Sequence, residues 1–213
     1  MPPALTKVEI KAPLPGVMPS RRERQKADRR ERIYRAAIEL FAAKGYGETT
    51  IQEITDRADL GKGTFFNYFD GKEAILVEYY RKVTGEFLDY ARTLKAPTFR
   101  KKIAALMRFS SDTAEREGAL FELLIREIFA SPALLQLDVQ TYQEILGLYI
   151  RFIEEGKQAG ELRPDLDAAI AARVLAGIYN LTCLEWVFLG KAFSMADMMM
   201  KKFDLVLNGM MKR

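Results

Sequence analysis

The chain has 213 residues, of which 49% are hydrophobic and 29% charged, a composition typical of a folded globular protein and inconsistent with global disorder. It contains no histidine and a single cysteine, Cys183, which excludes an internal disulfide and a thiolate metal cluster and removes the commonest general base. We therefore expect no enzyme, no metal and no cofactor. No apolar run reaches the roughly 18–20 residues that cross a bilayer, and residues 1–20 lack the pattern of a secretory signal, so the sequence predicts a cytoplasmic protein without a membrane partner.

Five of the eight prolines lie in residues 1–19, and the positive charge of the chain is concentrated directly after them. Residues 21–35 carry eight basic and three acidic side chains, a local charge of +5 against +4 for the whole chain. Such a segment is typical of phosphate contacts, although a solvated helix start would have the same composition. We predict that residues 1–24 form a flexible basic arm that follows the minor groove or flanking phosphates. Its arginines are Arg21, Arg22 and Arg24.

Beyond the proline-rich start the apolar residues recur at helical spacing, and no segment alternates like a β-strand, so we expect an all-α fold. The first helix, of about 16 residues, ends at Gly45. A second, of about eight residues, begins with a capping box of Thr50 and Glu53. A third, over residues 63–69, follows a four-residue turn. These dimensions predict a three-helix helix-turn-helix DNA-binding domain over residues 25–72, with the third helix as its recognition helix.

The predicted recognition helix has an unusual composition for a core helix. Phe65 and Phe69, spaced i and i+4, can anchor its inner face. Gly63 lets the backbone approach a phosphate closely. The side chains left outward can pair with base edges, contact a thymine methyl or stack on sugar. Those side chains are Thr64, Phe66, Asn67 and Tyr68, with Lys62 and Lys72 flanking them as phosphate contacts.

Over residues 29–72 the chain resembles the TetR family of bacterial regulators. Three stretches carry the resemblance, namely Thr49 to Ile54, Ala58 to Phe69 and Lys72 to Leu76. It implies a sequence-specific DNA-binding regulator. By this resemblance Thr50, with Thr49 beside it, and Lys72 hold phosphates, Lys62, Gly63 and Thr64 lie at the groove, and Phe66, Asn67 and Tyr68 reach bases or backbone.

Three positions depart from the family's common pattern. Many relatives carry glycine where Asp59 sits, serine where Gly61 sits and tyrosine where Phe66 sits. Aspartate tolerates a left-handed turn conformation, and glycine is only a slightly weaker helix N-cap than serine, so the geometry should survive. An acidic side chain near DNA and the loss of two hydroxyls should weaken the phosphate contacts.

Residues 73–213 are predicted to form a helical ligand-binding and dimerisation domain. After a first long helix that ends near Leu94, the apolar spacing predicts helices at about 99–117, 119–130, 133–159, 166–190 and 194–212. Pockets between the helices of a bundle are lined by apolar and aromatic side chains. Six side chains could line such a pocket for a small effector, and they are Phe87, Met107, Phe121, Tyr142, Tyr149 and Trp186.

The last two predicted helices are apolar on more than one side. The first of them carries Ile170 and Val174 on one stripe and Leu175 and Trp186 on another. A helix that is apolar on several faces needs partners on several sides. We therefore predict a homodimer in which these two helices form a two-fold four-helix interface, although a large monomer core would give similar stripes.

The sequence thus predicts a homodimeric repressor that binds a near-palindromic operator in double-stranded DNA and is released by a small, largely apolar effector. A ligand-independent regulator and an activator fit the same residues. Two alternatives come from other classes: an enzyme or lipid carrier built on the helical body, and an interaction scaffold that keeps the helix-turn-helix for structure only. Salt-dependent binding to genomic DNA fragments discriminates between them.

Overall fold

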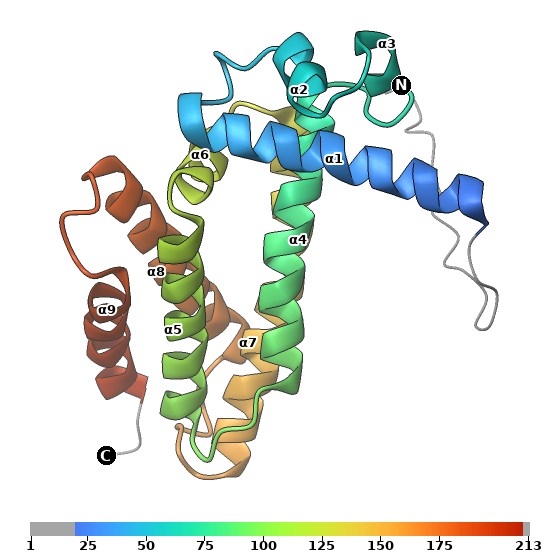
Figure 1. The fold of residues 1–213 in the computed structure, drawn as a ribbon. Helices are drawn as coiled ribbons and strands as arrows, with labels where there is room; N and C mark the ends of the chain where they lie inside the picture. Colours follow the sequence, from blue (N-terminus) through green and yellow to red (C-terminus); the bar gives the residue numbers. More distant parts are fainter. Residues whose placement is uncertain (1–19, 211–213) are drawn as a thin grey trace, which may run out of the picture.

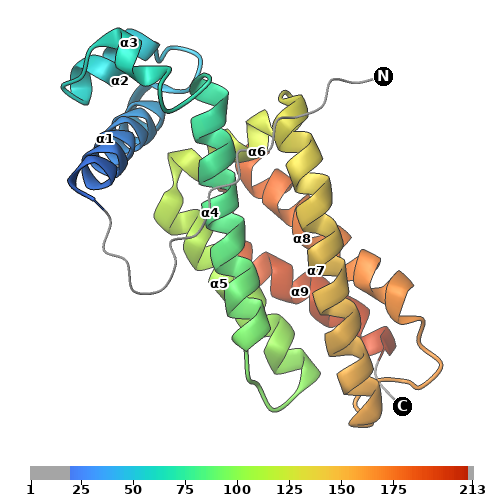
Figure 2. The same ribbon diagram turned by 90° about the vertical axis from the view of Figure 1, so that its right-hand side faces the viewer.

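The computed structural model describes residues 20–210, and within that range the chain forms nine α-helices and no β-strand (Figure 1). The all-α class expected from the sequence is confirmed. The helices α1–α3 form a small head at one end of the molecule, and α4–α9 form an elongated body (Figures 1 and 2). The helix bounds are α1 (Arg21–Lys44), α2 (Ile51–Arg57), α3 (Lys62–Phe65), α4 (Lys72–Thr93), α5 (Phe99–Glu117), α6 (Ala119–Glu127), α7 (Pro132–Gln158), α8 (Ala168–Phe188) and α9 (Met195–Met210).

The head is held together by apolar side chains from all three of its helices. The buried set is Ile33, Ala37, Phe41, Ile54, Phe65 and Phe69. The predicted capping box at the start of α2 is confirmed, because the Thr50 hydroxyl accepts the Glu53 N–H (3.2 Å) and the Glu53 carboxylate accepts the Thr50 N–H (2.9 Å).

The first helix begins earlier than expected, at Arg21 instead of near residue 29. Ser20 caps it in a second capping box: its hydroxyl accepts the Glu23 N–H (3.2 Å), and the Glu23 carboxylate accepts the Ser20 N–H (2.7 Å). The three arginines assigned to a flexible arm therefore belong to the start of α1. They are Arg21, Arg22 and Arg24. Residues 1–19, the rest of the predicted arm, lie outside the described residues.

The turn between α2 and α3 depends on a left-handed residue, Asp59, whose φ is 53°. Aspartate is one of the few residues with a side chain that adopt this conformation readily. Arg32 of α1 supports the turn, because its guanidinium donates to the carbonyl oxygens of Ala58 and Asp59. The departure from glycine at position 59 is thus accommodated within the geometry expected for a helix-turn-helix.

The third helix is a single turn, shorter than the predicted span of 63–69. After it the Asn67 N–H bonds to the Thr64 carbonyl (3.2 Å) and the Tyr68 N–H to the Phe65 carbonyl (2.9 Å). These bonds join residues three apart, so they tighten the chain into a turn instead of continuing an α-helix. We call the segment 62–68 the recognition segment.

The long helix α4 runs from the head into the body, where it packs on α5 and α7 (Figure 2). The helices α7 and α8 pair closely, and α9 packs on α5 and α8. The core of the head also continues into the body. Leu120, Leu124 and Ile128, which line one side of α6 and its C-terminal end, are buried in the same apolar cluster as Ile54 of the head. Head and body are therefore joined through packed side chains as well as through α4.

Within residues 20–210, α8 is the one helix long and apolar enough to cross a membrane by length and composition alone. It packs against α6, α7 and α9. Leu175, Thr182 and Trp186 are among its buried residues. A helix that packs against partners on several sides is apolar on several sides. The packing of α8 within the protein therefore explains its apolar sequence.

Candidate nucleic-acid interface and ligand cavity

The recognition segment lies at the outer end of the head, away from the body (Figures 1 and 2). Phe65 and Phe69 are buried beneath it, as the i, i+4 spacing predicts. Its remaining side chains are accessible to solvent: Lys62 and Asn67 are exposed, and Thr64 and Tyr68 are partly exposed. Gly63 is also exposed, with no atom within 4 Å of the position a Cβ would occupy. The surface therefore combines a cation, an amide, hydroxyls and accessible backbone.

Phe66 is the most unusual member of this surface, because 55% of this apolar residue is exposed. Its ring packs edge-to-face on that of Phe65, with centroids 5.4 Å apart. That contact is a favourable geometry for two aromatic rings, so it favours this orientation of the exposed ring. An exposed aromatic ring beside an asparagine suits contact with a sugar or a thymine methyl.

Several of the basic residues in the charged segment assemble the head. The Arg30 guanidinium forms a two-point ion pair with Glu78 of α4 and lies over the Phe69 ring, 4.7 Å from its centroid. Arg32 supports the turn after α2, as described above. These two arginines are therefore engaged within the protein, which the local charge count did not reveal.

Most of the exposed basic side chains of α1 lie in its N-terminal half. In Figure 1 this half extends past α4 and beyond the body. The exposed cations there include Arg21, Arg22, Lys26 and Arg29. A projecting helix with such side chains on its surface can lie along a phosphate backbone. Phosphate contact by these cations therefore stays a prediction, with a helix in place of the flexible arm.

Thr49, Thr50 and Lys72 were expected to face nucleic acid, but their polar groups are engaged inside the protein. The Thr49 side chain is buried and its hydroxyl donates to the Gly45 carbonyl (2.7 Å). The Thr50 hydroxyl takes part in the capping box and donates to Glu53 Oε2 (2.8 Å). Hydrogen bonds from Lys44, and then from Thr50, lower the pKa of Glu53 to about 2.

Lys72 fastens the start of α4 to the loop before α2. Its Nζ donates to the carbonyl oxygens of Tyr46 (2.7 Å) and Thr49 (2.6 Å) and lies 4.6 Å from the centroid of the Tyr46 ring. Two of its three N–H groups are thus used within the head. The geometry gives Lys72 a structural role, and the phosphate contact that the resemblance implied stays a prediction.

Replacing Lys72 by methionine should therefore lower the stability of the head. The Thr49 carbonyl would lose its donor and the Tyr46 carbonyl would keep only the Thr49 N–H (3.3 Å), and an unsatisfied buried group costs roughly 1–3 kcal/mol. We expect a lower melting temperature for Lys72→Met and an unchanged melting temperature for Lys62→Met, because the Lys62 side chain is exposed. The measurement is thermal unfolding followed by circular dichroism. An unchanged melting temperature for Lys72→Met would contradict the structural role.

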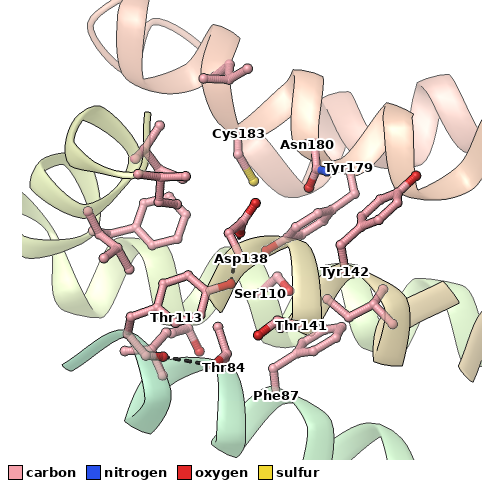
Figure 3. A pocket seen from close by; sticks show the side chains of 18 of the residues that line it. Thr84, Phe87, Ser110, Thr113, Asp138, Thr141, Tyr142, Tyr179, Asn180 and Cys183 are labelled. Carbon is pink, nitrogen blue, oxygen red and sulfur yellow. Dashed lines mark hydrogen bonds between the residues drawn. The ribbon is translucent and has the colours of Figure 1, made fainter. Parts of the chain in front are cut away.

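A cavity of about 160 Å³ lies in the body between α4, α5, α6, α7 and α8. In Figure 3 the side chains of Tyr179, Asn180 and Cys183 from α8 face Thr84 and Phe87 of α4 across it. The wall is mostly apolar. Its aromatic and aliphatic members include Phe87, Phe109, Phe121, Leu124, Ile125 and Ile128.

Polar groups form a minority of the wall. The Tyr80 hydroxyl donates to Asp138 Oδ1 (2.8 Å), which ties α4 to α7 at the edge of the cavity (Figure 3). Ser110 and Thr113 of α5 are buried, and their hydroxyls have no hydrogen-bond partner among the described residues. Burial raises the pKa of the Cys183 thiol to about 12, so it stays protonated and unreactive at neutral pH.

Three of the six side chains suggested for a ligand pocket line this cavity: Phe87, Phe121 and Tyr142. Met107, Tyr149 and Trp186 do not line it. All three are buried in the body core, and the Trp186 indole donates to the Phe193 carbonyl (3.1 Å). The sequence interpretation missed the polar wall. A signal was available, since Ser110 and Thr113 fall among the core-facing positions of an otherwise apolar helix face.

One face of α8 presents apolar side chains to solvent. Ile170, Val174, Leu181 and Phe188 are each more than 40% exposed, and their spacing places them along one side of the helix. Leu205 of α9 is also exposed. A contiguous exposed apolar stripe of this kind is typical of a surface that another protein covers.

The comparisons with known proteins agree with this architecture. The family model of bacterial regulatory proteins of the tetR family matches residues 33–79, and a model described as the C-terminal region of YsiA-like protein matches residues 121–209. The chain is 26% identical over 194 residues to the fatty acid metabolism regulator protein of Bacillus subtilis (strain 168), covering 87% of this chain and 97% of that protein.

The solved structures with the same fold include two regulators named FadR. The first is Thermus thermophilus FadR, a TetR-family transcriptional repressor, in complex with lauroyl-CoA, at 30% identity and a TM-score of 0.66, covering 86% of this chain and 96% of that one. The second is the regulator FadR from Bacillus subtilis in complex with stearoyl-CoA, at 24% identity and a TM-score of 0.69. The match covers 84% of this chain and 98% of that one.

Proposed function

The chain belongs to the TetR family of bacterial regulatory proteins, and on that basis we propose that it is a cytoplasmic transcriptional repressor that binds operator DNA as a homodimer and is released by a small, largely apolar effector. The matched relatives are named as regulators, which supports a regulator over an enzyme.

The observation that carries the DNA-binding proposal is the surface of the recognition segment. Phe66 and Asn67 are exposed on a segment whose other aromatic side chains, Phe65 and Phe69, are buried as its base. Asparagine can bond bidentately to adenine in the major groove. Lys62 and Thr64 on the same surface supply contacts to phosphates, and Tyr68 supplies a further aromatic contact.

The exposed stripe of α8 supports the homodimer. Two copies that pair through α8 and α9 cover that stripe in a four-helix interface. A two-fold dimer also presents two recognition segments to successive turns of a near-palindromic site.

The position of the cavity supports control by an effector. Leu124 and Ile128 line the cavity and also belong to the apolar cluster of the head. Tyr80 lines it from α4, whose first turns pack on the head, and bonds to Asp138 of α7. A ligand that displaces α6 or the Tyr80–Asp138 pair therefore changes the position of the head on the body, which alters the spacing of two heads in a dimer.

Related structures suggest a class for the effector. T. thermophilus FadR was solved with lauroyl-CoA. The cavity here has a mostly apolar wall and a volume close to that of an engineered apolar cavity that admits benzene. We therefore propose an effector with a compact apolar group that enters this cavity.

Selection of bound fragments from genomic DNA tests the proposed function. We expect the protein to recover a small set of fragments with a shared near-palindromic sequence, and binding should weaken steeply as salt rises, because released counterions favour the complex. The comparison is an unrelated fragment of equal length, measured at the same salt concentrations. Recovery of random fragments, or binding indifferent to salt, would contradict the proposal.

A further inference from the structure

We infer that the part of the effector that enters the cavity carries a hydrogen-bond-accepting oxygen, and that Ser110 and Thr113 of α5 bind it. This inference rests on the proposed function, because it takes the cavity as the effector site. It goes further in naming the chemistry of the buried group, which the apolar wall alone does not define.

The two hydroxyls are buried and make no hydrogen bond of ordinary length. Ser110 is 4% exposed and Thr113 is 5% exposed, and neither hydroxyl has a partner within 3.5 Å among the described residues. The Tyr179 hydroxyl of α8 is near enough to Ser110 for the serine to favour the ionised form of the tyrosine and so to oppose the rise of its pKa. Ser110 and Thr113 both line the cavity, and Figure 3 shows them on the wall that faces α8. Buried polar groups without a partner are rare in folded proteins, and each one that persists calls for an explanation.

Other hydroxyls on the helices of this chain show how such a group is ordinarily satisfied. Thr84, which lines the same cavity, donates to the Tyr80 carbonyl one turn earlier (2.8 Å). Thr182 donates to the Ile178 carbonyl in the same way (2.7 Å). Ser110 and Thr113 make no such bond to their own helix, so their hydroxyls remain available to a molecule in the cavity.

The spacing of the pair indicates what that molecule offers. Side chains at positions i and i+3 of a helix are neighbours on its surface, about 5–6 Å apart at their Cβ atoms. A carbonyl oxygen has two lone pairs, so one oxygen between them can accept from both hydroxyls. The surrounding wall includes Phe87 and Phe109. The buried group is therefore a compact carbonyl compound whose remaining surface is apolar.

Acetophenone and ethylbenzene form a matched pair of probes, since they are alike in size and differ by a carbonyl in place of a methylene. Their Kd values would be measured by equilibrium dialysis for the wild-type protein and for the double variant Ser110→Ala, Thr113→Val. Comparing the ratio of the two Kd values between proteins cancels the different hydration of the two ligands. In the double variant we expect the affinity for acetophenone to fall about tenfold or more relative to the affinity for ethylbenzene.

Thr84→Val is the matched control, because its hydroxyl lies on the same cavity but is already bonded. It should leave the ratio unchanged. The ligand-free double variant should melt no lower than the wild type, since it removes hydroxyls that have no partner. An unchanged ratio, or a double variant that melts well below the wild type, overturns the inference. Binding of the ligand-free protein to operator DNA, measured on the same samples, reports separately on the proposed function.

Discussion

The double variant Val174→Glu, Leu181→Glu should convert the protein to a monomer and lower its affinity for operator DNA by about 10²–10⁴-fold, the advantage that linking two binding modules ordinarily gives. The two side chains lie seven residues apart on one side of α8, and they are 41% and 53% exposed. In a two-fold interface each glutamate would be buried close to glutamates of the other subunit, which disfavours association. The measurements are sedimentation equilibrium and titration of an operator fragment.

Val139→Glu on α7 is the matched control. Val139 is 53% exposed, like Leu181, but lies off the α8 stripe. It should leave both the dimer and its operator affinity unchanged. Circular dichroism of both proteins would check that the helices persist. A double variant that stays dimeric would show that α8 is not the subunit interface. A monomer that binds the operator as tightly as the wild type would show that pairing of two heads does not strengthen operator binding.

Substitution of Asn67 by alanine should reduce operator affinity and relax the preference for one base in each half-site. A bidentate bond from asparagine to adenine is worth about 1–3 kcal/mol of discrimination, and a dimer loses it at both heads. Asn67 is exposed, so the head should keep its stability. The measurement is binding to a set of operators in which each base pair is changed in turn.

Lys62→Ala gives the contrasting result on the same surface. A lysine that contacts phosphate contributes equally to all sequences, so its loss should weaken binding uniformly and reduce the salt slope by about one for each contact removed. If Asn67→Ala leaves the base preferences intact while Lys62→Ala alters them, the roles assigned within the recognition segment are wrong.

The sequence predicted the helices well because their signals are local. The capping box of Thr50 and the end of the first helix at Gly45 both depend on residues within one turn of each other. The start of α1 was misplaced although Ser20 and Glu23 carry the same capping signal, because the surrounding run of arginines was interpreted as an arm. The α3 boundary was wrong for a different reason: a tight turn and a short helix share the same composition.

The roles of individual polar residues were harder to predict, since they depend on partners far away in the chain. Lys72 bonds to carbonyl groups 23 and 26 residues earlier, and Arg30 pairs with a glutamate 48 residues later. Nothing in their local sequence distinguishes these cations from the exposed Lys62. The cavity lining was similarly uncertain, because Tyr142 lines the space and Tyr149, two turns later on the same helix, is buried in the core.

The packing of α6 against the head bears on how regulators of this kind can be recombined. Leu120, Leu124 and Ile128 complete the apolar cluster that contains Ile54 and Phe65, so the unit that must be inherited together includes part of α6. A chimera that joins a foreign head to this body at residue 72 would place unmatched side chains against these three. Exchange of the whole head would then require this strip of α6 to be transplanted with it. A graft limited to the exposed side chains of the recognition segment, with Phe65 kept, would leave the cluster intact.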